Sequence, residues 1–135
     1  MLTRKTISLA DAKAIASAAS AKAVAEGWNV VIAIHDNGGN LVYLERADEA
    51  QLGSIQVAQE KSRTALRFKR PTKVLEELVL SGRVHMMSLP GITSVEGGLP
   101  LVVDGEIVGS IGVSGVQSHE DGQIAAAGAA VLAKR

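Results

Sequence analysis

Three groups of side chains in this 135-residue sequence have the types and spacing to do chemistry: histidines, a glutamate beside two glycines, and a basic run. The glutamate is Glu96, which precedes Gly97 and Gly98 in an irregular segment before a predicted strand. Backbone N–H groups of such glycines can hold an anion, and we expect the missing side chains to leave space for a ligand. Glu96 could then act as a general base if burial raises its pKa. The alternatives are plain turn geometry at the glycines and a turn-capping role for Glu96.

The basic run lies within residues 61–70, which contain no acidic residue. Arg63 and Arg67 recur at helical spacing, so they lie on one side of a predicted helix. A guanidinium group matches the geometry of a carboxylate, so this side could clamp an anionic ligand. We take Lys61 and Arg63 as candidate ligand-binding residues, together with Arg46 at the end of a predicted strand. A solvated helix face is the alternative.

The three histidines are dispersed along the chain. His35 ends a predicted strand, and we take it with Glu96 as a candidate catalytic pair for proton transfer. His85 precedes Met86 and Met87, and imidazole and thioether groups are the ligands that can hold a haem iron. The spacing of the histidines does not match a structural metal site, so we predict no other metal.

Composition excludes several classes of function. Lys and Arg together equal Asp and Glu at 14 each, whereas nucleic-acid-binding domains usually carry a basic excess. The absence of cysteine excludes disulfides, thiolate metal sites and a cysteine nucleophile. No apolar run reaches the length of a membrane span, and the first residues lack the features of a signal peptide. We therefore expect a cytoplasmic protein with neither a nucleic-acid partner nor a membrane partner.

The elements that must position these residues follow from helix caps and turn signals. A capping-box pattern and Gly27 bound a first helix, Pro71 separates a second helix from a third, and Asp104-Gly105 marks a tight hairpin. The predicted elements are helices over 8–26, 54–70, 72–82 and from 118, and strands over 29–35, 41–46, 99–103 and 106–113, with a short strand possible at 92–96. We predict one domain over 1–135, an α/β fold of the α+β type. Its central antiparallel sheet is flanked by helices in the order α-β-β-α-α-β-β-α.

Three ordered segments resemble the GlcG/HbpS family, also called the haem-degrading or DUF336 family. They are the run VVIAIHDNGGNLV at 30–42, Gly53-Ser54 with Ala58, Lys61, Thr64, Ala65 and Phe68, and the set LPGI at 89–92, GGLPL at 97–101, Val108-Gly109 and IGVSG at 111–115. Together they cover nearly the whole chain. The resemblance implies a sheet flanked by helices, assembly into dimers or larger oligomers, and haem or haem-like ligands in characterised relatives. It also implies a place in catabolism for many members.

Two hypotheses about function follow. The first is a small-ligand-binding homo-oligomer that holds haem or another anionic compound near a subunit interface. The second is a cofactor-independent enzyme, an isomerase, deaminase or lyase, that acts on a small carboxylate through Glu96 and His35. The alanine-rich first helix and the glycine-rich last strand look like flat surfaces on which copies of the chain assemble.

Overall fold

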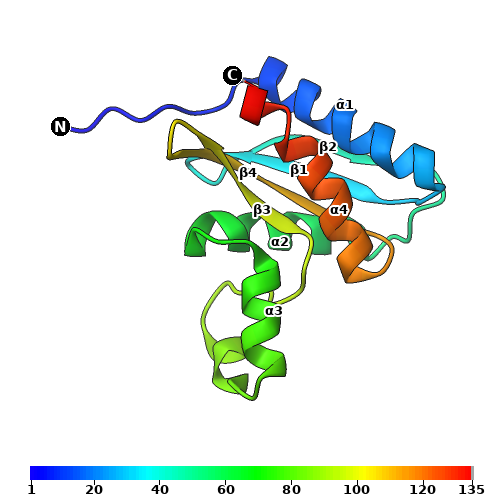
Figure 1. Cartoon of the computed structure of the whole chain (residues 1–135), viewed down its shortest axis with the longest axis vertical. Coiled ribbons are helices and arrows are strands. Elements are labelled where there is room, and N and C mark those ends of the chain that lie inside the picture. The colour runs from blue at the N-terminus through cyan, green and yellow to red at the C-terminus, as the bar shows by residue number, and fades with distance from the viewer. Residues whose placement is uncertain (135) are drawn as a thin grey trace.

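The computed structural model describes residues 1–134, and the order of its elements confirms the predicted order (Figure 1). The elements are α1 (Leu9–Glu26), β1 (Val31–Asp36), β2 (Leu41–Arg46), α2 (Ser54–Phe68), α3 (Thr72–Leu80), the 3₁₀ helix η1 (Val84–Ser88), β3 (Gly98–Val103), β4 (Glu106–Ser114), α4 (Ser118–Ala129) and the 3₁₀ helix η2 (Leu132–Lys134). No helix in this described part of the chain is long and apolar enough to cross a membrane.

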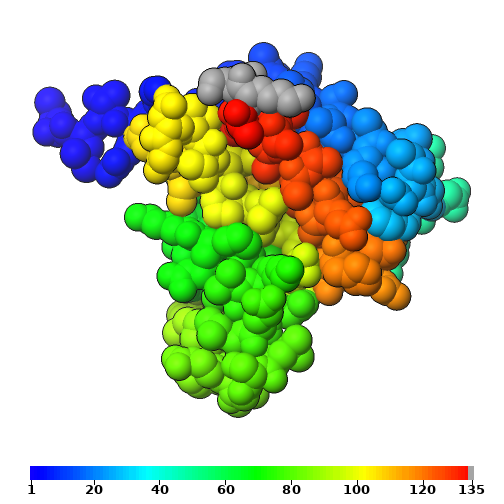
Figure 2. All heavy atoms as spheres, viewed as in Figure 1, coloured from blue at the N-terminus to red at the C-terminus, as the bar shows by residue number. Residues whose placement is uncertain are grey.

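The four strands form one sheet in the order β2-β1-β4-β3, and every neighbouring pair is antiparallel. Helices α1 and α4 lie together on one face, where Ile15 and Ile124 pack with Ile111 of β4. Helix α2 covers the other face, where Ala58 packs with Val31 and Ala33 of β1. Helix α3 and η1 form an arm that stands out from this body (Figure 2).

Local sequence signals fix the ends of α1. The Ser8 side chain accepts a hydrogen bond from the Asp11 N–H, the Asp11 carboxylate accepts from the Ser8 N–H, and Gly27 closes the helix at φ 72°. Four alanines on one side of α1, Ala12, Ala16, Ala19 and Ala23, lie inside the core, and β4 runs in the middle of the sheet. The last strand is therefore not an assembly surface, because the single chain already buries it. Assembly through α1 stays a prediction, since Ala14, Ala21 and Ala25 are exposed.

Two other predictions differ from the structure. Residues 92–96 form no strand, because they run along α2 instead, where the Thr93 N–H donates to Thr64 Oγ1 at 2.9 Å. Ser118 and Asp121 have the spacing of a capping box and predict a cap at Ser118, whereas helix α4 is capped by Gln117 with Glu120. The shift of one residue leaves the Asp121 side chain turned into the protein.

Glycines let α2 lie very close to the sheet. A Cβ atom on Gly112 would collide with the Ala58 carbonyl oxygen, and one on Gly98 would collide with the Lys61 carbonyl oxygen. The Gly98 N–H also donates to Thr72 Oγ1 at 2.8 Å. The expectation of open space beside Gly97 and Gly98 is therefore wrong, since atoms of α2 and β4 fill it.

Replacing either glycine should therefore destabilise the fold. We expect Gly98→Ala and Gly112→Ala each to lower the free energy of unfolding in urea by about 1–3 kcal/mol or more, because α2 must move away from the sheet. Gly53→Ala is the matched control, because nothing lies within 4 Å of its Cβ position. Equal stability of all three variants would contradict this account of the packing.

Candidate functional site

A row of polar side chains lies buried between α2 and the sheet. Ser54 of α2 and Ser114 of β4 are hydrogen-bonded at 3.0 Å. Further along the helix, Ser62 Oγ lies 2.8 Å from Ser110 Oγ and 2.7 Å from His35 Nδ1. A hydrophobic interface would bury more apolar area here, whereas these small hydroxyl groups satisfy one another at close range.

His35 is fully buried in this row, and its Nε2 atom has no hydrogen-bond partner among the described residues. Burial lowers the pKa of His35 from 6.5 to about 4, and the positive charges of Arg63 and Arg67 act in the same direction against the attraction of Asp36. The imidazole is therefore neutral at physiological pH. Because its side chain is enclosed, the ring presents no surface to a substrate outside the protein.

The Lys61 side chain is buried and makes its polar contacts inside the protein. Its Nζ atom forms an ion pair with Asp121 Oδ2 of α4 at 3.0 Å and donates to the Val113 carbonyl oxygen at 3.0 Å, and both side chains are 2% exposed. Burial raises the pKa of Asp121, and the neighbouring Lys61 charge opposes that rise. The ammonium group thus joins α2 to α4, and this contact leaves it enclosed rather than presented to a ligand.

The structure does not gather Glu96, His35 and Arg46 into one site. Glu96 lies against Gly122 at the start of α4, and its N–H donates to Glu76 Oε1 at 3.2 Å. Arg46 Nη1 donates to the Asp48 and Ala50 carbonyl oxygens and so holds the loop after β2. Among the described residues, no hydrogen bond or ion pair links any two of the three.

The three candidate iron ligands lie on η1, in the arm. His85 and Met87 are exposed and Met86 is half-buried. The 3₁₀ helix is packed against α3 and lies outside the sheet and its two covering layers (Figure 2). In the part of the chain that the structure describes, no cluster of three or more His, Asp or Glu side chains is arranged to hold a metal ion.

Two positively charged side chains, Arg63 and Arg67, line a groove between α2 and the turn that joins β1 to β2. We call it the basic groove, and its volume is about 330 Å³. It is lined by Arg63, Leu66 and Arg67 of α2 and by Asn37, Gly38 and Gly39 of the turn.

The two arginines of the groove make only weak contacts with the rest of the protein. Arg63 pairs with Glu60 at 3.1 Å on the half-exposed surface, and Arg67 Nη1 donates to the Gly91 carbonyl oxygen at 3.2 Å. Arg63 was a sequence candidate, whereas Arg67 and the turn were not. The sequence signal for Arg67 was its spacing of four residues from Arg63, which places the two arginines one above the other on α2.

The state of His35 can be checked by NMR titration of the imidazole resonances. We expect its ring to stay neutral until about pH 4 because burial disfavours the charged form. The unfolded chain takes up this proton near pH 6.5, so its contribution to stability is complete above that pH and falls as the pH drops toward 4. His85→Gln and His119→Gln variants identify the other two signals. A His35 resonance that titrates near 6.5 would contradict the enclosed geometry.

Comparisons with known proteins agree on the relationship of this chain. A family model described as haem degrading protein HbpS-like matches residues 7–130. Protein GlcG of Escherichia coli (strain K12) is 45% identical over 134 residues, which are 99% of this chain and 100% of GlcG. A double mutant of Streptomyces reticuli HbpS is 33% identical with a TM-score of 0.89, covering 98% of this chain and 90% of that one. A crystal structure of a PduOC–haem complex is 28% identical with a TM-score of 0.83, covering 93% and 94%. The chain therefore belongs to the HbpS-like family.

Proposed function

We propose that this protein binds an anionic ligand of the haem type in the basic groove. The observation that carries the proposal is the pair Arg63 and Arg67, which face the Asn37–Gly39 turn with the apolar Leu66 between them. Two guanidinium groups one helical turn apart can each take a carboxylate, and Leu66 offers contact to an apolar ligand body. A relative of this chain, PduOC, has been solved as a complex with haem.

The groove fits the acidic part of haem. Arg63 and Arg67 would hold the propionate groups, and Leu66 would contact the ring. The lining contains no histidine, methionine, cysteine or tyrosine, so it offers no side chain of the usual kinds to the iron. His85, Met86 and Met87 stay candidate iron ligands predicted from the sequence, and they lie on η1 in the arm rather than in the lining of the groove. When bound, haem would supply an iron centre.

Both arginines are free to exchange their present partners for a ligand. Arg67 makes no ion pair among the described residues, and the pair between Arg63 and Glu60 is half-exposed. Such surface pairs are worth only about 0–1 kcal/mol, so a carboxylate that both arginines bind would displace Glu60 at small cost. His35 behind them is neutral and adds no charge that would bind the anion.

No observation favours the alternative of a cofactor-independent enzyme. His35 is enclosed, and Glu96 makes its contacts with α3 and α4 instead of with His35. Assembly into a dimer or larger oligomer stays a prediction from the family resemblance, and light scattering at micromolar concentration tests it.

Haemin titration followed by the Soret absorption tests the proposed function. We expect Arg63→Gln and Arg67→Gln each to weaken haemin binding by about tenfold or more, because each removes a charge-assisted hydrogen bond to a carboxylate. Lys73→Gln is the matched control, since it removes one exposed positive charge on α3 outside the groove. Wild-type affinity in both arginine variants would overturn the assignment of the groove.

A further inference from the structure

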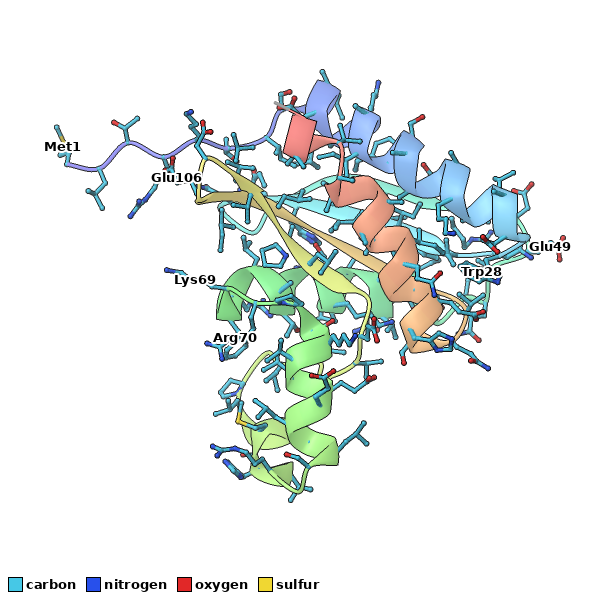
Figure 3. All side chains as sticks on the ribbon, viewed as in Figure 1. Met1, Trp28, Glu49, Lys69, Arg70 and Glu106 are labelled. Atoms are coloured by element: carbon cyan, nitrogen blue, oxygen red, sulfur yellow. The ribbon has the colours of Figure 1, made fainter. Side chains whose placement is uncertain are left out.

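A second pocket continues the basic groove past Leu66. We call it the outer pocket, and its volume is about 370 Å³. Asn37 and Leu66 line both hollows, so the two meet at these residues. The other residues that line the outer pocket are Arg4, Lys69, Gly105, Glu106 and Ile107. Figure 3 shows Lys69 at the end of α2 and Glu106 at the turn end of the β3–β4 hairpin above it.

The basic groove and the outer pocket together form one hollow, which we call the joined hollow, and positively charged side chains line both of its ends. Arg63 and Arg67 line the basic groove, and Arg4 and Lys69 line the outer pocket. Neither Arg4 nor Lys69 makes an ion pair among the described residues. Glu106 is the one acidic residue in either lining. This local excess is notable in a chain whose formal net charge is zero, and it focuses the field on the hollow.

Apolar side chains lie between and beside these charges. Leu66 stands at the junction of the two hollows, and Ile107 lines the outer pocket. Lys69, which follows the last residue of α2, lies six positions after Arg63, and this corresponds to about 9 Å along the helix axis at 1.5 Å per residue. The Lys69 backbone ends α2 in the left-handed conformation at φ 54°, which fixes where this cation leaves the helix.

We propose that the joined hollow binds an elongated dicarboxylate, with one carboxylate at Arg63 and Arg67, the other at Arg4 and Lys69, and an apolar spacer across Leu66. The inference rests on the proposed function in one respect, which is that the basic groove is the ligand site. The inference goes beyond the proposed function in the kind of ligand. Haem carries both carboxylates on one edge and therefore needs positive side chains at only one end of the hollow. Glu106 lines the same outer pocket and repels a carboxylate there, so the two positive charges of Arg4 and Lys69 must outweigh its single negative charge.

Calorimetric titration at low salt tests the proposal. The ligands are linear dicarboxylates from succinate to suberate, and each is compared with its monomethyl ester. We expect affinity to peak at one chain length, where the diacid binds about tenfold or more tightly than its monoester. Lys69→Asn should bring the diacid down to the level of the monoester and leave the monoester unchanged. Asparagine suits this variant because it tolerates the left-handed backbone. Arg67→Gln should weaken both ligands, and Lys73→Gln should weaken neither.

The outcomes separate the two claims. A diacid that binds no more tightly than its monoester at any length overturns the dicarboxylate site, and so does wild-type diacid affinity in Lys69→Asn. Either result leaves haemin binding at Arg63 and Arg67 intact. The converse result is also distinct. If neither arginine variant changes the affinity for haemin, while diacid binding selects one chain length and depends on Lys69, the dicarboxylate site is supported and haem does not bind in the groove.

Discussion

The close approach of α2 to the sheet is the constraint on which the rest of the structure depends. Two glycines, Gly98 of β3 and Gly112 of β4, face backbone atoms of α2 at positions where any side chain would collide. On the helix side the residues at this contact are small, with Ala58 and Ser62 fully buried. Dense packing of this kind leaves no void for a ligand, so a ligand must bind at the edge of the contact rather than within it.

The same approach explains the polar layer under the helix. With little room for large apolar side chains, the Ser62 hydroxyl forms hydrogen bonds with the Ser110 hydroxyl and with Nδ1 of His35. Lys61 reaches past this layer to Asp121 of α4, which joins α2 to the helices on the far face of the sheet. Removal of one partner would leave an unpaired buried charge, and such a change typically costs about 3–5 kcal/mol. Two buried residues, Lys61 and Ser62, thus hold the helix from which the next residue, Arg63, reaches the groove.

Sequence reasoning succeeded where the signal is local. The Ser8 capping box, the left-handed Gly27 and the Asp104-Gly105 turn each depend on a few neighbouring residues, and the structure contains all three. It failed where the partner lies far along the chain. Lys61 and Asp121 are 60 residues apart, so nothing near Lys61 indicated that its charge is neutralised inside the protein. The space beside Gly98 was misread for the same reason, because the atoms that fill it belong to α2. The pairing of Arg67 with the Asn37–Gly39 turn likewise requires the fold.

The central claim is that anions bind at the basic groove, and amide NMR with gallium protoporphyrin, a diamagnetic haem analogue, tests it most directly. We expect the largest chemical-shift changes at the amides of Gly38 and Gly39 and at the side-chain N–H groups of Arg63 and Arg67. Smaller changes at η1 would fit an iron ligand from the arm. Changes gathered around Gly97 and Gly98, with the turn and both arginines unaffected, would contradict the account.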